Sequence, residues 1–339
     1  MLLPDAESYS LGKLVRSLGI PVSDRHRANG DALATVKLFK LLLAKDSEKK
    51  IVQDVIRKET QGELSEKQLD IVRSMPNETG LFYLHNKDGD IIYLSKSTDI
   101  KKKVNQLFTK SGSSSRKLIK DTKKVTFEKT GSELVAHIKE YQELLKNRPK
   151  FNRIPRKRMY THAITKITDA SGYDALSVVE FKNSLNKWGR FNGEFSAKNH
   201  LFKITKEFHL CDKVNGLSEA KNNCSKYTEG KCYGACIKKE DINTYNERVA
   251  QALDKYSLKD KDVLLIDKGR EIGENSVILI RKGSLVGVGY YDLNHQINNI
   301  HILESLITPM NGTENANFII ESYLRKKRII KTISLNTDL

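Results

Sequence analysis

The four cysteines of this chain lie within one stretch of 26 residues, at Cys211, Cys224, Cys232 and Cys236. The last three belong to the segment CSKYTEGKCYGAC, and the full spacing is C-x12-C-x7-C-x3-C. Four thiolates satisfy either a tetrahedral zinc ion or a [4Fe–4S] cluster, and the spacing alone does not decide between them. In a reducing compartment, clustered cysteines bind metal more often than they form disulfides. The array therefore predicts a metal module that stabilises the loops around it.

The chain carries no signal for a membrane or for export. It has no apolar run near the roughly 20 residues that a membrane helix needs. The N-terminus MLLPDAESYS lacks a basic segment followed by an apolar one. We therefore expect a cytoplasmic protein that does not contact membranes. Because 339 residues is long for a single hydrophobic core, we also expect several compact units.

The formal net charge is +17, and the basic residues are concentrated in two runs. Residues 96–126 contain ten Lys or Arg and two acidic residues, while residues 146–158 contain seven and no acid. Such runs favour phosphates, because neutralising phosphates releases condensed counterions. A lysine-rich surface that only aids solubility is the alternative, but two dense runs favour nucleic acid. The residues that we expect to contact DNA are Lys101, Lys102, Arg116, Lys117, Arg148, Arg153 and Arg156.

The hydrophobic pattern predicts a mixture of helices and short strands. Residues 8–45 have a helical period with one break, which predicts two helices, and the charged residues 46–72 predict a linker helix. The segments LFYLHN and IIYLS flank Asp88-Gly89 and predict a β-hairpin. The pattern then predicts helices at 98–108 and 115–121, the strand VTFEK, and a helix that begins at the N-cap Ser132.

The second half of the chain shows the same mixture. We expect two strands in 159–183, an amphipathic helix at 195–209, a helix over NTYNERVAQALDKY, the strands VLLIDKG, SVILIRKG and LVGVGYY, a helix at 316–326 and the strand RIIKTISL. The fold class is therefore α/β and α+β with several domains. The expected divisions are 1–45, the linker 46–72, a small α/β domain 73–155, a Cys-rich region 156–245 and an α+β domain 246–339.

Residues 79–152 resemble the GIY-YIG nuclease domain of the UvrC family of excinucleases. The resemblance rests on TGLFYLHNKDGDIIYLSKSTDIKKKV, TGSELVAHIKE and RPKFN, in that order. It implies a three-stranded sheet flanked by helices and an endonuclease that requires Mg or Mn. It also implies that Glu140 binds the metal, that Tyr93 is the tyrosine of the second motif, and that Lys96 is the lysine after that motif.

Three positions depart from the pattern of this family: Phe82 replaces the first tyrosine, Ser95 a glycine, and Lys103 the helix arginine. Tyr83 is a poor substitute for Phe82, because adjacent residues of a strand point to opposite faces. Lys103 keeps the charge but lacks the bidentate guanidinium fork. A positioned acid or base contributes roughly 10² to 10⁴ in rate, so the loss of two such groups leaves little turnover. A catalytically degenerate DNA-binding module is therefore the alternative to a nuclease.

Residues 8–45 resemble the C-terminal end of a DEDDh 3′-5′ exonuclease of the polymerase proofreading type. In SYSLGKLVRSLGIPVSDRHRANGDALATVKLFKLL, His26 matches the general base and Asp31 matches a metal ligand. The upstream carboxylates of such an enzyme are missing, since Asp5-Ala6-Glu7 directly precedes the first helix and is not on a strand. We therefore expect a remnant of this domain without exonuclease activity.

Together, these resemblances indicate a bacterial DNA-repair nuclease in which an exonuclease remnant is fused to a UvrC-like region. The four cysteines nearly reproduce the UvrC spacing, which implies a [4Fe–4S] cluster with zinc as the alternative. The expected partners are DNA and other repair or replication proteins. A third interpretation is a metal-stabilised scaffold that binds proteins. Residues 260–339 show no catalytic constellation, and we predict an accessory domain there.

Overall fold

The computed structural model describes residues 3, 6, 8–21, 28–45, 64–182, 187–292, 300–326 and 329–335. The chain divides into two units, Met1–Arg73 with Asn105–Arg116, and Ser74–Val104 with Lys117–Leu339. In the part that the structure describes, no helix is long and apolar enough to cross a membrane.

The first unit begins with two helices that contact each other, α1 (Leu11–Ser17) and α2 (Ala28–Lys45). Ser10 is the N-cap residue of α1, and Leu14 and Val15 are buried. The two helices predicted in residues 8–45 are confirmed. The predicted linker helix is described only at its end, as α4 (Glu66–Ser74), because residues 46–63 lie outside the described residues.

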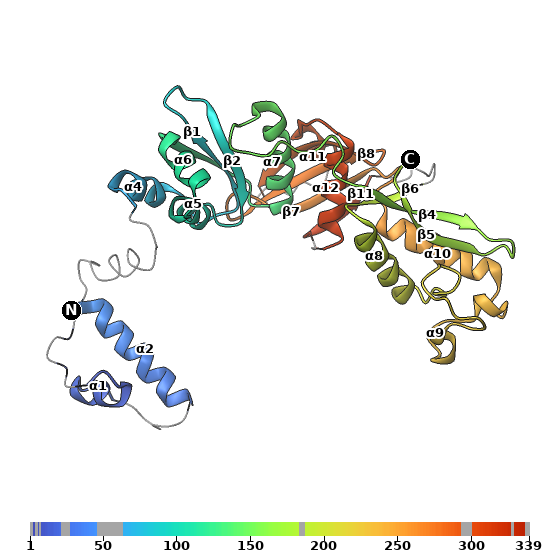
Figure 1. Ribbon diagram of the computed structural model, residues 1–339, viewed down its shortest axis with the longest axis horizontal. Helices are drawn as coiled ribbons and strands as arrows, with labels where there is room; N and C mark the ends of the chain where they lie inside the picture. The colour runs from blue at the N-terminus through green and yellow to red at the C-terminus, as the bar shows by residue number, and fades with distance from the viewer. Residues whose placement is uncertain are drawn as a thin grey trace. The chain divides into compact units, whose positions relative to one another are not determined.

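A three-stranded antiparallel sheet with the order β2-β1-β3 opens the second unit. Its strands are β1 (Gly80–His85), β2 (Ile91–Ser97) and β3 (Lys124–Lys129). The helices α5 (Ile100–Thr109) and α6 (Ser113–Asp121) connect β2 to β3. After β3, α7 (Glu133–Asn147) packs against β1 and β2, as Figure 1 shows. The predicted hairpin and the N-cap Ser132 are both confirmed.

A second antiparallel sheet has the order β5-β4-β6. It consists of β4 (His162–Thr168), β5 (Asp174–Glu180) and β6 (Lys187–Phe191), and α8 (Glu194–Glu207) packs across all three strands. The short helices α9 (Ser225–Thr228) and η1 (Ala235–Ile237) follow, and then α10 (Ile242–Tyr256). One hydrophobic core includes α8, α10 and three of the cysteines. The domain boundary that we expected at 245/246 falls inside α10, and the packing of α10 assigns the whole helix to this core.

The last sheet has five strands in the order β10-β9-β8-β7-β11. The strands are β7 (Val263–Lys268), β8 (Glu274–Arg281), β9 (Ser284–Asp292), β10 (Thr308–Pro309) and β11 (Lys331–Ser334). Two further helices are α11 (Ile300–Ser305) and α12 (Glu314–Leu324). The helix α12 contacts α7, β6 and β9, and its buried residues share a core with Leu134 and Ile138 of α7. The C-terminal region therefore packs directly on the helix that carries Glu140 (Figure 1).

Candidate functional site

The carboxylate of Glu140 is bound to the end of strand β2. The Oγ of Ser132 accepts hydrogen bonds from the backbone N–H groups of Leu134 and Val135, which fixes the start of α7. Two turns later, Glu140 Oε1 accepts one hydrogen bond from Ser95 Oγ at 3.2 Å and one from the backbone N–H of Lys96 at 3.0 Å. The structure thus brings together residues that are about 45 positions apart in the sequence.

Ser95 is a site residue that our sequence reasoning treated only as a departure from a pattern. Its hydroxyl lies 3.2 Å from Glu140 Oε1 and 3.4 Å from the carbonyl oxygen of Lys96, and it donates to these acceptors. The Ser95 side chain therefore holds the expected metal ligand against β2, two residues along the strand from the expected catalytic tyrosine. The only sequence signal was the hydroxyl itself, at a position where the family pattern has glycine.

The aromatic residues of β1 and β2 are arranged as the strand alternation predicted. Phe82 is fully buried and its ring centroid lies 6.2 Å from that of the half-buried Tyr93. Tyr83, the next residue, hydrogen bonds to Glu128 Oε2 at 3.4 Å. Burial, followed by the charge of Glu128, raises the pKa of Tyr83. Tyr83 therefore does not supply the hydroxyl that Phe82 lacks.

The electrostatic environment keeps two groups near the site neutral at physiological pH. Burial raises the pKa of Tyr93, a hydrogen bond with Ser95 opposes that rise, and the charge of Glu140 adds to it. His137 lies one turn before Glu140 on α7. Burial, reinforced by the charge of Lys96, lowers the pKa of His137 to about 4. The site therefore contains a protonated phenol and a neutral imidazole.

Asn152 is a second residue whose role the sequence did not reveal. Its Oδ1 accepts from the backbone N–H of Leu94 at 2.9 Å, and its Nδ2 donates to the carbonyl of Leu94 at 2.8 Å. The N–H of Phe151 also donates to the carbonyl of Ile92 at 3.0 Å. The segment after α7 is thereby attached to the edge of β2 beside Tyr93. The available signal was the final Asn of RPKFN, one of the three stretches that resemble the nuclease domain.

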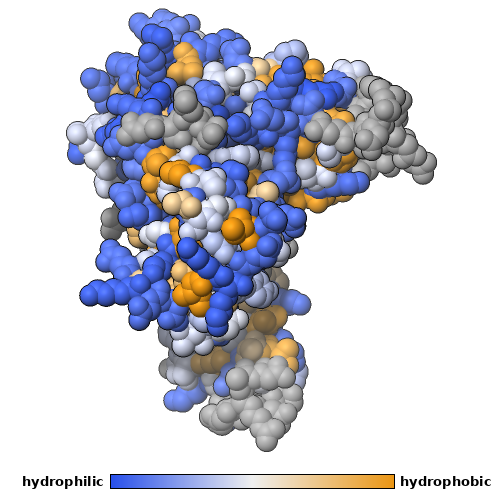
Figure 2. Space-filling model, turned by 90° about the vertical axis from the view of Figure 1, so that its right-hand side faces the viewer, coloured by the Kyte–Doolittle hydropathy of each residue, from blue (hydrophilic) through white to orange (hydrophobic). Residues whose placement is uncertain are grey.

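The predicted DNA-binding residues lie mostly on exposed positions. Lys102 and Lys103 on α5, Arg116 and Lys117 on α6, and Arg153 and Arg156 after α7 are exposed, whereas Lys101 is half-buried. Arg148 is the exposed C-cap residue of α7 and has a left-handed backbone, with φ 45°. Figure 2 views the chain from the right-hand side of Figure 1, and the face that it shows is largely hydrophilic, with small separate apolar patches. The exposed Lys and Arg side chains of α5, α6 and the segment after α7 suit a polyanion better than an apolar partner.

The four cysteines lie in or against the hydrophobic core that α8 and α10 share. The Sγ atoms of Cys211, Cys224 and Cys236 all lie within 4.8 Å of one another. The Sγ of Cys224 lies 3.7 Å from that of Cys211 and 3.6 Å from that of Cys232. Both distances match the roughly 3.8 Å edge of a tetrahedron with zinc–sulfur bonds of about 2.3 Å. Cys232 does not belong to the group of three thiols that lie within 4.8 Å of one another, so the structure shows three close thiols with a fourth beside Cys224.

Electrostatics distinguish Cys224 from its neighbours. Burial raises the pKa of Cys211 and raises that of Cys232 to about 11. Burial also acts on Cys224, but hydrogen bonds from the backbone of Tyr227 and from the neighbouring thiols lower its pKa overall. Cys224 therefore becomes a thiolate more readily than Cys211 or Cys232.

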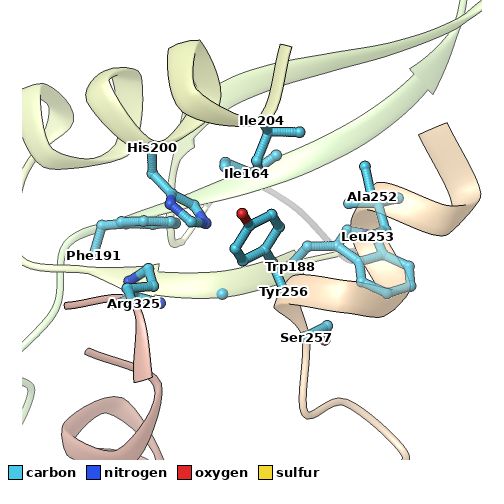
Figure 3. A pocket seen from close by; sticks show the side chains of 11 residues that line it. Ile164, Trp188, Phe191, His200, Ile204, Ala252, Leu253, Tyr256, Ser257 and Arg325 are labelled. Carbon is cyan, nitrogen blue, oxygen red and sulfur yellow. The ribbon is translucent and has the colours of Figure 1, made fainter. Parts of the chain in front are cut away.

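A small cavity in the same domain does not have the properties of a ligand site. Figure 3 shows that His200, Tyr256 and Trp188 point into it from α8, α10 and β6. Its volume is about 10 Å³, close to the minimum for one water molecule. Burial, followed by the charge of Arg325, lowers the pKa of His200 to about 4, so the imidazole is neutral.

Comparison with known families identifies two consecutive domains in this chain. Residues 78–153 match the model of the UvrC-like GIY-YIG domain. Residues 162–255 match the model of the UvrC/Cho excinuclease middle domain. The chain contains a UvrC-like GIY-YIG domain followed by a UvrC middle domain. The resemblance inferred from the motifs is confirmed for these two regions.

Full-length relatives resemble the chain only moderately. It is 23% identical to UvrABC system protein C of Chelativorans sp. (strain BNC1) over 54% of this chain and 29% of the relative. It is 27% identical to UvrABC system protein C of Clostridium botulinum (strain Hall) over 57% of this chain and 32% of the relative. The chain therefore spans about a third of the length of the curated relatives that it matches.

One solved structure is similar to part of this chain. The GIY-YIG N-terminal endonuclease domain of UvrC from Thermotoga maritima, bound to its catalytic magnesium ion, matches 26% of this chain and 100% of its own, with 22% identity and a TM-score of 0.25.

Of the two residues that the exonuclease resemblance singled out, the structure describes only Asp31. His26 lies outside the described residues. Asp31 is half-buried in the first turn of α2, and its carbonyl accepts a hydrogen bond from Thr35 Oγ1 at 2.8 Å.

Proposed function

We propose that this protein is a metal-dependent endonuclease that cleaves DNA phosphodiester bonds at the site formed by β2 and α7. The observation that supports this most strongly is the anchoring of Glu140 to Ser95 and Lys96, beside Tyr93. A UvrC-like GIY-YIG domain and DNA-repair relatives support the same reaction class.

The residues fit a divalent cation that keeps most of its water. Both described hydrogen bonds of Glu140 use Oε1, so we assign the cation to Oε2. Mg²⁺ commonly binds through one or two carboxylates and retains several water molecules, so a single glutamate is sufficient. When bound, the cation would activate water and offset phosphate charge. Mn²⁺ is an alternative at the same ligand.

The other residues act on the phosphate and on protons. The raised pKa of Tyr93 makes its phenol a hydrogen-bond donor at neutral pH, and a nearby cation would lower that pKa. Lys96 and Lys103 supply positive charge that stabilises the transition state. The exposed cations of α5, α6 and the segment after α7 would bind the DNA backbone.

The second candidate function is a DNA-binding module with a degenerate nuclease site. The observation that favours it is the complete burial of Phe82, which places a ring without a hydroxyl beside Tyr93. Lys103 adds to this argument, because an ammonium group cannot make the bidentate contact of a guanidinium.

The deciding experiment is cleavage of labelled duplex, bubble and single-stranded DNA with Mn²⁺ by anaerobically purified chain. Glu140→Gln removes the charge of the ligand, and Glu143→Gln is the matched control, because Glu143 lies on the same helix and accepts from Asn147. Cleavage that is lost only in Glu140→Gln supports the endonuclease. Salt-sensitive binding without cleavage in all three proteins supports the degenerate module.

A double variant that restores the two family residues separates the endonuclease from the degenerate module more clearly. Phe82→Tyr with Lys103→Arg returns the two groups that the chain lacks, each worth roughly 10² or more in rate. If the wild-type chain is inactive and this double variant cleaves DNA, the fold and metal site are intact and only these two groups are missing. If neither protein cleaves any of the three substrates, the endonuclease proposal fails.

We further propose that the four cysteines bind a metal, as zinc or as a [4Fe–4S] cluster. The approach of three thiols to within 4.8 Å of one another and the lowered pKa of Cys224 support a metal. Elemental analysis and the visible absorption of iron–sulfur centres distinguish the two. The fusion to an exonuclease remnant in residues 1–45 stays a proposal, supported by two adjacent helices and Asp31.

A further inference from the structure

The outward face of α8 carries two exposed phenylalanines. Phe195 is 79% exposed and Phe202 is 53% exposed, whereas Ala197, Leu201 and Ile204 of the same helix are buried in the core. Positions seven residues apart lie on one face of a helix, about 10 Å from each other along its axis. Two large aromatic rings in water therefore form a row that the fold itself does not use.

Lysines separate and extend this row. Lys198 and Lys206 lie three and eleven residues after Phe195, on the same face, and the stretch 196–206 contains no acidic residue. Lys198 pairs with Glu194, but both side chains are more than half exposed, so the pair is weak and its cation can exchange to a phosphate. The ammonium group of Lys226, from α9, lies 5.5 Å from the centroid of the Phe202 ring. Lys226 also pairs with Asp212 and is only 11% exposed, so Lys198 and Lys206 are the cations of this face that can reach a phosphate.

We propose that this face of α8 binds a single strand of DNA, with bases stacked on Phe195 and Phe202 and phosphates bound by the lysines. Aromatic rings interleaved with cations are the general chemistry of single-strand binding, because every base offers a flat face. A protein-docking helix would instead present contiguous apolar side chains, and here Lys198 and Asn199 lie between the rings. Charge complementarity therefore selects the nucleic acid. This inference deepens the proposed function and rests on DNA being the substrate.

A third exposed aromatic residue lies close to the end of the helix. Tyr233 is 59% exposed, and its ring centroid lies 6.2 Å from that of His209, two residues after α8. The Arg248 guanidinium lies 4.9 Å from the centroid of the Tyr233 ring. The same combination of aromatic ring and cation therefore recurs beside the C-terminal end of α8, which supports a strand that continues past Phe202.

The test is fluorescence anisotropy of a labelled single strand and of the matching duplex, with the full chain in buffer without added divalent cation. Phe195→Ala with Phe202→Ala removes both rings, and Phe195→Tyr with Phe202→Tyr keeps both stacking faces. Phe127→Ala is the control, because Phe127 is another exposed phenylalanine, 40% exposed on β3. Circular dichroism verifies that each variant folds, as expected for exposed positions.

We expect each lost ring to weaken single-strand binding about 5- to 100-fold, with the tyrosine variant and Phe127→Ala close to wild type and duplex binding nearly unchanged. Unchanged single-strand binding in the alanine variant would overturn the proposal. Equal losses of single-strand and duplex binding would also overturn it. So would a loss of single-strand binding in the tyrosine variant, which would indicate an apolar contact with another protein. Glu140→Gln should bind the single strand like wild type, so failure of the nuclease proposal and of this one are distinguishable.

Discussion

A buried hydrogen bond between Ser132 and Asp267 should control the stability of the helix that carries Glu140. Ser132 is 1% exposed and Asp267, on β7, is 7% exposed, and Ser132 Oγ donates to Asp267 Oδ2 at 2.7 Å. The same oxygen caps α7. Ser132→Ala therefore removes an N-cap, worth about 1 kcal/mol. It also removes a donor from a buried carboxylate, which costs about 1.5 to 3 kcal/mol. The expected loss of local stability is about 2.5 to 4 kcal/mol.

The surrounding backbone leaves little room for relaxation. Gly131 has φ +66°, and a Cβ there would lie 1.7 Å from the carbonyl oxygen of Gly269. The two chain segments are thus in direct contact where Ser132 meets Asp267. Because neither segment can move toward the other, the vacated hydroxyl position cannot be filled by a small shift.

Native-state hydrogen exchange of the α7 amides measures this prediction, because it reports local opening free energies. Ile138 is a suitable probe on α7, and Leu201 on α8 is an internal control in a different core. In an Asp267→Ala background, Ser132→Ala should cost only the cap, about 1 kcal/mol, since the carboxylate is already absent. Equal costs in both backgrounds, or unchanged exchange of Ile138, would refute the reasoning.

Three further predictions follow from single residues. Burial lowers the pKa of His200 to about 4, below about 6.5 in the unfolded chain, so the unfolded state binds more protons between these values. The His200 contribution to stability, monitored by Trp188 fluorescence, should fall by up to about 3 kcal/mol from pH 6.5 to 4, and His200→Phe should make the total fall smaller by that amount. Asn152→Ala leaves both backbone groups of Leu94 unpaired and should destabilise the GIY-YIG domain by about 1 to 3 kcal/mol in thermal unfolding, while an unchanged melting temperature would contradict the pairing. Cys224→Ser should abolish bound metal in elemental analysis, whereas retained metal would exclude a four-thiolate site.

The sequence predicted the elements that have a strong internal period and missed those that depend on distant contacts. The hairpin of β1 and β2 and the helix α7 follow from strand alternation, a turn at Asp88-Gly89 and a serine cap. Strand β6 was missed because all but the last of its five residues are half-buried, which gives no alternation to recognise. It pairs with β4 through an irregular register, so its strand conformation depends on that partner.

The candidate site shows the same division. Glu140, Tyr93 and Lys96 could be selected because a family motif places them, and residue type then suggests their chemistry. The hydrogen bond from Ser95 to Glu140 and the pairing of Asn152 with Leu94 join residues 45 and 58 positions apart. Local patterns carry no information on such contacts, so a serine in place of a glycine could only be recorded as a difference.

The C-terminal region illustrates why a segment without catalytic residues can still matter to a site. Its sequence offered no constellation, and we predicted only an accessory domain. In the structure, α12 shares a core with α7, and Asp267 binds the residue that caps α7. Glu140 lies on that helix, and an error of about 1 Å in the position of a reacting group costs roughly 10²-fold in rate. The support that α12 and Asp267 give to α7 depends on packing between separate segments, so it leaves no motif in the sequence of either segment. The Ser132 and Asp267 variants test this support directly.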